Sequence, residues 1–581
     1  MARLAGVVVR SRINRRYYTR RTVGLRVGLV TPFTWSQPHD VNDHVAGIAG
    51  GLRRLGHTVT ILAPSNRARD LRAGRRALQR GELGDVVALG PALPVSRRST
   101  MAAPVGLRAN LALALAHGSF DIVHGFEPGL PSLSYLALRD TQALAVATFL
   151  SADRLFYPPG KAQRARLLGR VDALLATSNE MATAAAVRFP GDYTVVAAGV
   201  DSDLFQPATK RLRIVVEIVP GEREFARSAI RTLDQLAAWE IILVRQSALG
   251  GRPYVPLRLR TRVHVRTHPS EAERAAVLNE ATIFVPAPGG SERLALEAAA
   301  AGAATASDSI GIVELAQGGA RRVATIPESF DAVAGKLAAI YTRLARRRRS
   351  VRVDEDPLSD RDWVVCDLHT HTSWSHDCSV PAEDLLDAAE AIGLGAIAVT
   401  DHNVFGGAVE SVELAKGRAL TVIAGEEVKT NGQGEVIGLF LREEIPRGMS
   451  FEDTIAAIRA QGGLVFLPHP FDRRHAIADP ATLHRHLAEI DVLEVYNARL
   501  LSETYNDEAL RFARKYNLLR GAGSDAHVLP GLGTGALRMR TFRTPEEFLI
   551  SLRTAEILRR PKSLAYLQSL KWVAQVKEKV R

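Results

Sequence analysis

The sequence predicts an α/β protein in which two lobes of alternating strands and helices precede a β/α barrel with a metal site. Three observations support this prediction. At 581 residues the chain is too long for a single core. From residue 23 onward, short apolar runs alternate with helical patterns. Between residues 363 and 527, six apolar runs each end within a few positions of a His, Asp, Glu or Asn.

The composition indicates a folded protein without a membrane span. Hydrophobic residues make up 46% of the chain and charged residues 24%, which is close to the globular average. No apolar stretch approaches the ~20 residues needed to cross a bilayer. Only two cysteines occur, Cys366 and Cys378, so no disulfide framework is expected. We therefore expect a cytoplasmic protein that is at most peripheral at the inner membrane surface.

The net charge of +13 is unevenly distributed, because the basic excess is concentrated near the N-terminus. Residues 1–24 are basic and lack periodicity, so we interpret them as a leader that is flexible or lies on the surface. Their charge could serve peripheral contact with an anionic membrane, or binding of nucleic acid or of a phosphate-bearing substrate. An Arg-rich solvated surface explains it equally well.

Two strand–helix series form the front of the chain. The first, residues 25–207, opens with a strand at Leu25–Thr31, a helix at Asp43–Leu55 and a strand at Val59–Leu62, which make a βαβ unit. It ends in a connection at 192–207. The second series, residues 208–345, begins with a strand at Leu212–Glu217. Each series therefore predicts one Rossmann-like lobe.

A charged, Pro-containing linker at 346–362 separates these lobes from the predicted barrel at 363–560, and a helical tail is expected at 561–581. Parallel strands of a barrel deliver their site residues at their C-terminal ends. The six predicted strands are Trp363–Cys366, Ala396–Thr400, Leu420–Ala424, Leu464–Leu467, Val492–Tyr496 and Leu518–Gly523.

The side chains that follow these strands are metal ligands in type and exceed what one ion can use. Imidazole suits zinc, manganese and iron, and carboxylates suit harder ions. Five His and several carboxylates therefore predict two or three ions that share bridging carboxylates. Such a cluster clamps the attacking and leaving oxygens of a phosphoryl displacement and lowers the pKa of a bound water towards ~7.

The motifs around these residues resemble those of the polymerase and histidinol phosphatase (PHP) superfamily. They occur in the family's order: Asp367–Thr372, Thr400–Asn403, Gly425–Glu427, Pro468–Pro470 and Gly523–His527. The resemblance implies a distorted (β/α)₇ barrel, two or three divalent ions (Zn, Mn or Fe) and hydrolysis of phosphoric esters. The metal ligands that it implies are His369, His371, Asp377, His402, Glu427, His469, Asp525 and His527, with Glu427 as the bridging carboxylate.

The remaining site predictions concern residues near these ligands. Asp401 is expected to act in catalysis by orienting a ligating imidazole. Asn497 stands where many members carry His or Cys, so the third ion is in doubt. Glu435 stands where a His is often found, so a different contact is expected there. Three residues could hold the substrate phosphate or simply face solvent: Arg473, His475 and Arg499. His484 and His486 are expected to face solvent from a helix.

Several segments before residue 346 resemble the GT-B glycosyltransferases of family 4, including Leu55–Pro64, Phe120–Pro128 and Leu296–Gly302. The resemblance implies a nucleotide-sugar site between two Rossmann-like lobes. His39-Asp40 replaces the family's Gly-Gly turn, Leu150 occupies the place of a catalytic His, and only the second Glu of the Glu-x₇-Glu motif remains, as Glu297. The sequence therefore favours a degenerate lobe pair.

The leading hypothesis is a metal-dependent phosphoric ester hydrolase fused to a degenerate GT-B module. Its substrate would be a phosphorylated small molecule or a short nucleic acid. One alternative is an active glycosyltransferase that uses a nucleotide sugar, with the PHP domain as an accessory or editing hydrolase. Another is a binding protein whose metal centre only holds structure.

Overall fold

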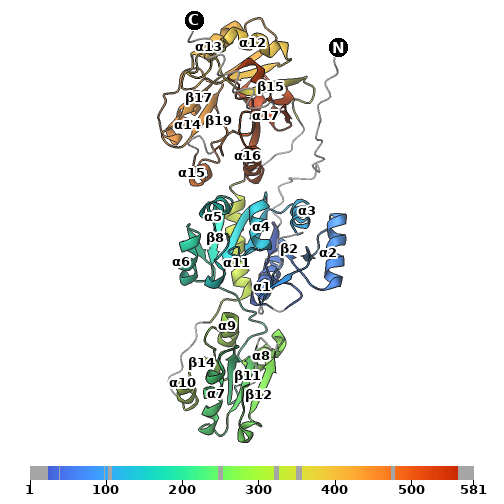
Figure 1. The fold of residues 1–581 in the computed structure, drawn as a ribbon, viewed down its shortest axis with the longest axis vertical. Coiled ribbons are helices and arrows are strands. Elements are labelled where there is room, and N and C mark those ends of the chain that lie inside the picture. Colours follow the sequence, from blue (N-terminus) through green and yellow to red (C-terminus); the bar gives the residue numbers. More distant parts are fainter. Residues whose placement is uncertain are drawn as a thin grey trace. The chain divides into compact units, whose positions relative to one another are not determined.

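The computed structural model describes residues 24–37, 39–96, 99–101, 107–245, 253–267, 269–318, 326–348, 356–472 and 478–560 (Figure 1). The predicted tail and, apart from Gly24, the predicted basic leader lie outside the described residues, and the expected membrane contact lies with that leader. One compact unit comprises residues 22–345, and the other is formed chiefly by residues 346–581. No helix in the described part of the chain is long and apolar enough to span a membrane.

The first lobe of the front unit is built on a seven-stranded sheet with the order β3-β2-β1-β6-β7-β8-β9. All of its neighbouring strands pair in parallel. The strands are β1 (Arg26–Val30), β2 (Thr58–Ala63), β3 (Val86–Ala88), β6 (Ile122–Phe126), β7 (Leu144–Phe149), β8 (Ala173–Ala176) and β9 (Tyr193–Val195). A hairpin of β4 (Leu93–Ser96) and β5 (Ser99–Met101) stands apart from this sheet.

Helices cover this sheet because the strands are apolar on both faces, as parallel strands usually are. Helix α11 belongs to this lobe although it follows the second lobe in sequence (Figure 1), and it packs against α1. The helices are α1 (Asp40–Arg54), α2 (Ala68–Arg80), α3 (Arg108–Gly118), α4 (Leu133–Asp140), α5 (Lys161–Leu168), α6 (Asn179–Arg188) and α11 (Phe330–Ala345).

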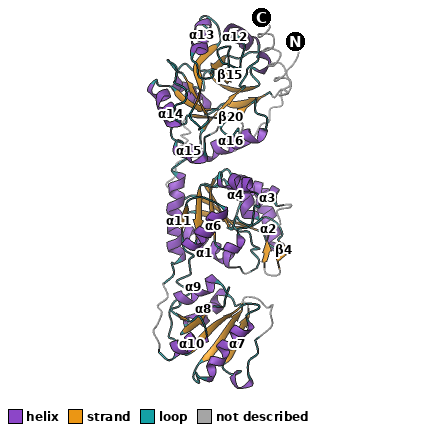
Figure 2. Ribbon diagram, turned by 60° about the vertical axis from the view of Figure 1, so that its left-hand side comes forward, coloured by secondary structure: helices purple, strands orange, loops and turns teal. Residues whose placement is uncertain are grey.

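The second lobe has a five-stranded parallel sheet with the order β12-β11-β10-β13-β14. Its strands are β10 (Arg213–Ile218), β11 (Glu240–Arg245), β12 (Val263–Thr267), β13 (Ile283–Val285) and β14 (Ala304–Thr305). The strands lie between two layers of helices (Figure 2). One layer is α7 (Arg223–Arg231) and α10 (Ser309–Ala316), and the other is α8 (Glu271–Asn279) and α9 (Glu292–Ala300).

The C-terminal unit is a nearly closed barrel, which confirms the predicted distorted (β/α)₇ fold. Seven strands, β15 to β21, follow one another in the sheet, and a bridge between Thr370 and Ala526 joins the two ends of this row. Its strands are β15 (Trp363–Thr370), β16 (Ala396–Val399), β17 (Thr421–Lys429), β18 (Glu435–Leu439), β19 (Leu464–Leu467), β20 (Val492–Asn497) and β21 (Leu519–Gly523).

The barrel is distorted because β18 runs antiparallel to both of its neighbours. Two further strands, β22 (Gly535–Arg540) and β23 (Glu556–Arg559), extend the sheet beyond β15 in antiparallel pairing. The helices of the unit are α12 (Ala382–Ala391), α13 (Gly406–Leu414), α14 (Phe451–Ala460), α15 (Pro480–Arg485), α16 (Glu503–Tyr516) and α17 (Pro545–Leu552).

Two local predictions were wrong. The connection predicted at 192–207 contains an edge strand, β9, which is only three residues long and therefore carries little pattern. His486 does not face solvent: it is buried against the ring of Phe451, and its Nδ1 lies 3.0 Å from Glu489 Oε2. The helix α15 ends at Arg485, so His486 sits in the turn that leads back to the barrel.

A buried carboxylate at the end of β6 has an unusual backbone and environment. Glu127 is fully buried and has a positive φ of 52°, which is uncommon for a residue other than glycine. Its Oε1 accepts a hydrogen bond from Arg154 at 3.0 Å. Burial raises the pKa of Glu127 to about 7, although Arg154 and nearby backbone amides oppose this shift. The folded lobe therefore favours the protonated carboxyl.

We expect the stability of the first lobe to fall as the pH rises from 4.5 to about 7, because the raised pKa makes ionisation of Glu127 unfavourable only in the folded state. Glu127→Gln should remove about 2 kcal/mol of this loss. Urea titrations at pH 5 and pH 8, read by pulsed hydrogen exchange on peptides from β6 and β7, measure it. The exposed Glu180→Gln variant serves as control, and an equal pH dependence in all three proteins would contradict the assignment.

Candidate metal centre

The strand ends of the barrel bring together all eight of the predicted ligands. Four groups of three ligands have their ligand atoms within 4.8 Å of one another. His369 lies on β15 and Glu427 on β17, and the others follow the C-terminal ends of strands. Most of these side chains are buried, whereas His402 and Asp377 remain partly exposed. The four groups are His371/His402/His527, His369/His371/Asp525, His369/Glu427/His469 and His402/Glu427/Glu435.

Glu427 lies at the centre of this cluster. Its Oε2 is 3.2 Å from His369 Nε2 and 3.1 Å from His402 Nδ1, and its Oε1 is 3.0 Å from His469 Nε2. His371 Nε2 is 3.5 Å from Oε2. Although burial opposes ionisation, the charge of His369 and the other imidazoles holds the pKa of Glu427 well below its usual range. One carboxylate therefore faces four imidazoles, as a bridging ligand would.

The orientation of His369 creates a need for a cation. Its Nδ1 is 3.1 Å from Glu494 Oε1, so Nδ1–H donates to this carboxylate and Nε2 carries the lone pair. Nε2 and Glu427 Oε2 are then two acceptors only 3.2 Å apart. Without an ion a proton must fill this gap: burial opposes the charge, but Glu427, Asp525 and Glu494 raise the pKa of His369 well above its usual value. A metal ion would displace that proton.

His402 and His469 show the same pattern. Burial disfavours the imidazolium form of both, but Glu427 outweighs it and raises the pKa of each to about 9. His469 also has a positive φ of 24°, and Asp525 has one of 52°. Strained backbones of this kind persist where the surrounding structure holds them, often at functional sites.

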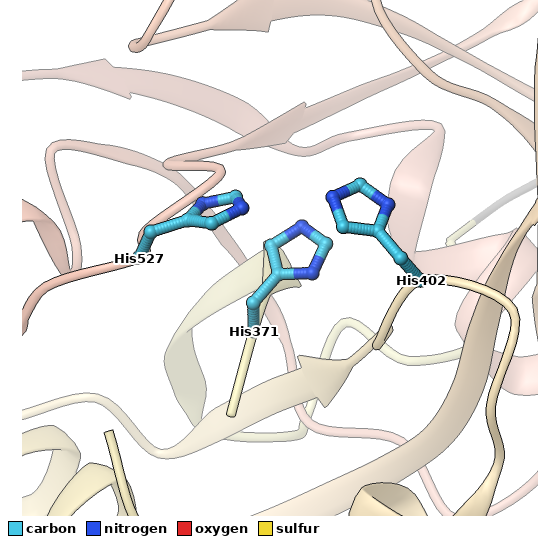
Figure 3. A group of neighbouring side chains, drawn as sticks. All are labelled: His371, His402 and His527. Carbon is cyan, nitrogen blue, oxygen red and sulfur yellow. The ribbon is translucent and has the colours of Figure 1, made fainter. Parts of the chain in front are cut away.

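A second group of imidazoles faces a common space beside the first (Figure 3). The ring centroid of His371 is 4.4 Å from that of His402 and 4.3 Å from that of His527. Asp377 adds a carboxylate, with Oδ2 3.1 Å from His527 Nε2 and Oδ1 3.6 Å from His402 Nε2. Three nitrogens and one oxygen are a donor set that suits zinc, manganese or iron.

His371 presents a bare nitrogen to this space. Its Nδ1 lies 3.2 Å from Ser375 Oγ, which donates to Asp401 Oδ1 at 2.7 Å, so Nδ1–H can donate to the serine. Nε2 is buried and has no hydrogen-bond partner among the described residues. Asp401 thus reaches the imidazole through Ser375 and not directly, and it also accepts from Thr372 N and Oγ1. An orphaned, buried imidazole nitrogen fits a metal ligand.

The Gly-Ser-Asp sequence begins at the last residue of β21, where close packing at the centre requires a glycine. A Cβ on Gly523 would lie 2.3 Å from the Cβ of His369. Asp367 fastens the same loop, because its carboxylate accepts hydrogen bonds from the backbone N–H of Ser524 and Gly533. Burial raises the pKa of Asp367 to about 6 despite these bonds. Asp525 is thereby held against His369 and His371.

Asn497 does not offer a free ligand atom. Its Nδ2 donates to Glu494 Oε2 at 3.1 Å and to Asp525 Oδ2 at 3.3 Å, and its Oδ1 accepts from the backbone N–H of Arg499. The Arg499 side chain, 34% exposed, lies at the rim with Nη1 3.0 Å from Asp525 Oδ1. Asn497 therefore positions its neighbours where a further His or Cys ligand is absent.

The structure adds two carboxylates that the sequence reasoning did not assign to the site. Glu435 lies with the ligands, its Oε2 3.7 Å from His469 Nε2. Glu494 contacts His369 from within the apolar run Val492–Tyr496. A charged residue inside a buried strand is rare without a partner, and this signal could have identified it. Arg473 and His475 lie outside the described residues. Glu426 turns away, its Oε2 accepting from the backbone N–H of Ile445.

Comparison with known families agrees with this geometry. The sequence matches the PHP domain over residues 367–503 and the PHP-associated family over residues 503–557.

The C-terminal unit belongs to the PHP family.

Two uncharacterised proteins of Methanocaldococcus jannaschii are similar to part of this chain. One is 35% identical over 211 residues, which cover 34% of this chain and 84% of the relative. The other is 36% identical over 157 residues, which cover 25% of this chain and 90% of the relative.

The front unit carries a Glycosyltransferase Family 4 domain, which matches residues 41–204. A phosphatidyl-myo-inositol mannosyltransferase of Propionibacterium freudenreichii is 35% identical over 166 residues. The match covers 28% of this chain and only 42% of that relative. The family match ends at residue 204, before the second lobe begins.

A carboxylate lies at the point where the strand order of the second lobe reverses. In parallel sheets ligands bind at the C-terminal ends of strands where the strand order reverses, often against a helix N-terminus. That position lies between β10 and β13, beside the start of α9. There the buried Glu217 accepts a hydrogen bond from the backbone N–H of Ser291 at 2.8 Å. A Cβ on Gly290 would lie 2.0 Å from Glu217 Oε2, so this glycine allows the carboxylate to enter.

Other elements of the predicted transferase site are also engaged within the protein. Both oxygens of Glu297 accept from Arg274 at 2.7 Å, and Oε1 also accepts from Arg293. Glu297 is fully buried in this ion-pair network. At the first lobe, His39 caps α1, its Nδ1 accepting from the backbone N–H of Val41. Each of these groups therefore has a partner within the protein.

We expect Glu427→Gln to reduce the divalent ions that the full chain retains after reconstitution with Mn²⁺ or Zn²⁺, from about two per chain in the parent. The neutral amide of Gln cannot compensate the positive charge of ions that bind to the surrounding imidazoles. Glu426→Gln is the matched control, because the neighbouring carboxylate points out of the centre, and it should keep the parental content. Elemental analysis after dialysis measures both. Equal metal content in the two variants would contradict the central role of Glu427.

Proposed function

We propose that the PHP unit hydrolyses phosphoric esters with the help of two divalent ions, and that the front unit does not transfer sugars. The observation that carries the first part is the set of imidazole nitrogens that converge on a single buried carboxylate, where protons or metal ions must supply the positive charge. His371 Nε2 lacks any hydrogen-bond partner among the described residues, and His369 Nε2 faces Glu427 at 3.2 Å. Purely structural sites rarely use so many ligands.

The residues divide into two groups that would each hold an ion. His369, Glu427 and His469 form the inner group, and His371, His402 and His527 form the outer one with Asp377. Asp525 lies between His369 and His371. When bound, divalent ions neutralise phosphoryl charge and lower the pKa of water. The absent ligand at Asn497 supports two ions and leaves a third without a full donor set.

Arg499 would bind the substrate phosphate. Its guanidinium is at the partly exposed rim, within 3.2 Å of His527 Nε2 and 3.0 Å of Asp525 Oδ1. Burial opposes its charge, but Asp525 and Asp377 outweigh this and raise its pKa, so it stays a cation. Guanidinium pairs with phosphate oxygens through parallel hydrogen bonds. The Asp401–Ser375 pair would act on His371 by fixing its ring orientation.

The second candidate function, glycosyl transfer from a nucleotide sugar, is supported by the family 4 match. Against it stands Glu217 of β10, which contacts Ser291 at the start of α9, where a diphosphate would need positive charge and free N–H donors. Asp40 of the first lobe adds a further carboxylate there, accepting from Ser291 Oγ at 2.9 Å. A diphosphate placed beside two carboxylates would be repelled.

We expect the full chain with Mn²⁺ to release phosphate from some members of a panel of sugar phosphates, nucleotides and short oligonucleotides. His369→Ala or Asp525→Ala should lower kcat about a thousandfold or more, because metal Lewis acidity supplies several kcal/mol. Arg499→Ala should raise KM about 10- to 100-fold, the loss of hydrogen bonds to a charged group. The surface arginine variant Arg418→Ala is its control. Undiminished hydrolysis in His369→Ala would refute the proposal.

We expect the full chain to show no saturable binding of nucleotide sugars in calorimetry up to millimolar concentration. A Kd in that range corresponds to a binding free energy of about −4 kcal/mol. Nucleoside diphosphates with glucose, mannose and N-acetylglucosamine cover the common donors. Tight binding accompanied by hydrolysis or transfer of the sugar would overturn this part of the proposal.

A further inference from the structure

We propose that Glu494 is a positioning residue that sets the affinity of the inner group for divalent ions. This inference rests on the proposed metal centre, but not on which substrate it serves. Glu494 lies on β20 and is buried, and each of its oxygens contacts a different part of the site.

The contacts of Glu494 reach two ligands of the inner group. Its Oε1 is 3.1 Å from His369 Nδ1. Its Oε2 accepts the backbone N–H of His469 at 2.6 Å and Nδ2 of Asn497 at 3.1 Å. The same carboxylate therefore sets the ring orientation of one histidine and the backbone of another. Through Asn497 it also reaches Asp525, which lies 3.3 Å from that amide.

Within the described part of the chain, the charge of Glu494 has no basic partner outside the centre itself. Among the described residues no Lys or Arg forms an ion pair with it, and the only ion pair that it makes is with His369. A buried carboxylate costs several kcal/mol unless positive charge or hydrogen bonds compensate it. Here the compensation comes from the imidazole, which is positive when protonated and strongly polarised when it binds a cation. The carboxylate thus favours an occupied inner group.

This arrangement has a direct consequence for His369. With Nδ1–H committed to Glu494, Nε2 is the only nitrogen that can bind an ion, and it faces Glu427. Carboxylates that hold a ligating imidazole in this way also raise its basicity, and their loss typically costs 10- to 100-fold in metal affinity. His469 depends on Glu494 differently, because the bond to its N–H holds a backbone with a positive φ.

A purely structural role would predict a different outcome. In that case Glu494 would only tie β20 to the loop after β19, and its loss would lower stability without changing how tightly ions bind. The residue just before β20 offers a matched control. The buried Asp491 accepts the backbone N–H of Val465 at 2.8 Å and pairs with Arg459.

The test compares Glu494→Gln with Asp491→Asn in the full chain after its ions have been removed by chelation. Each protein is titrated with Mn²⁺ alone, and electron paramagnetic resonance reports the free ion. We expect Glu494→Gln to raise the Kd of the tighter Mn²⁺ site about 10- to 100-fold. Asp491→Asn should lower the melting temperature and leave the Kd unchanged. Excess Mn²⁺ should then restore much of the kcat of Glu494→Gln.

An unchanged Mn²⁺ Kd in folded Glu494→Gln would overturn the proposal, and so would an equal loss in Asp491→Asn. If Glu494→Gln does not fold, Glu494→Asp is measured instead: it keeps the charge but withdraws it from His369, so an unchanged Kd overturns the proposal equally. Since the titration contains no substrate, a chain that binds Mn²⁺ in this manner but hydrolyses no phosphoester would refute the proposed function and leave the role of Glu494 intact.

Discussion

The barrel's centre depends on one buried carboxylate, Glu427, which must be compensated by positive charge. Its two oxygens lie 3.0 to 3.2 Å from nitrogens of His369, His402 and His469. No Lys or Arg among the described residues pairs with Glu427, so protons or metal ions must supply the charge. Both choices require the imidazoles to point inwards from different strands. The need of Glu427 for positive charge therefore links the convergence of the strand ends to the chemistry of the site.

Holding these imidazoles in place requires a layer of groups behind them. Glu494 engages His369 Nδ1, Ser375 engages His371 Nδ1, and the backbone oxygen of Asp525 engages His527 Nδ1. In each case the nitrogen that faces the centre is left to accept a proton or to bind a metal ion. The layer also closes the barrel, since the backbone N–H of Asp525 donates to the carbonyl of His369. Barrel closure and ligand orientation thus share the same residues.

The sequence could identify residues whose type and spacing indicate a metal ligand. It could not identify residues whose role depends on the side chain that they contact in the fold. Histidines that follow successive apolar runs, such as His369 and His469, indicate side chains that meet at the C-terminal ends of neighbouring strands. Glu494 was not assigned because a single Glu within a buried strand indicates that a partner exists but not which residue that partner is. The strand β18 was missed because its five residues, Glu435–Leu439, follow β17 by a short turn and alternate weakly. Antiparallel β18 also could not be inferred from a rule for parallel strands.

The contrast proposed between the two units follows from how each kind of site is built. The proposed ion site has many ligands and can do without one at Asn497, because Glu427 and the imidazoles around it still require positive charge. A diphosphate site has less tolerance, because it depends on a few N–H donors and on low negative charge. The carboxylate of Glu217 takes one of those donors, from Ser291, and adds the wrong charge. The buried Arg274 is likewise neutralised by Glu297. These carboxylates are thus partners, within the protein, of groups that could otherwise contact a bound anion.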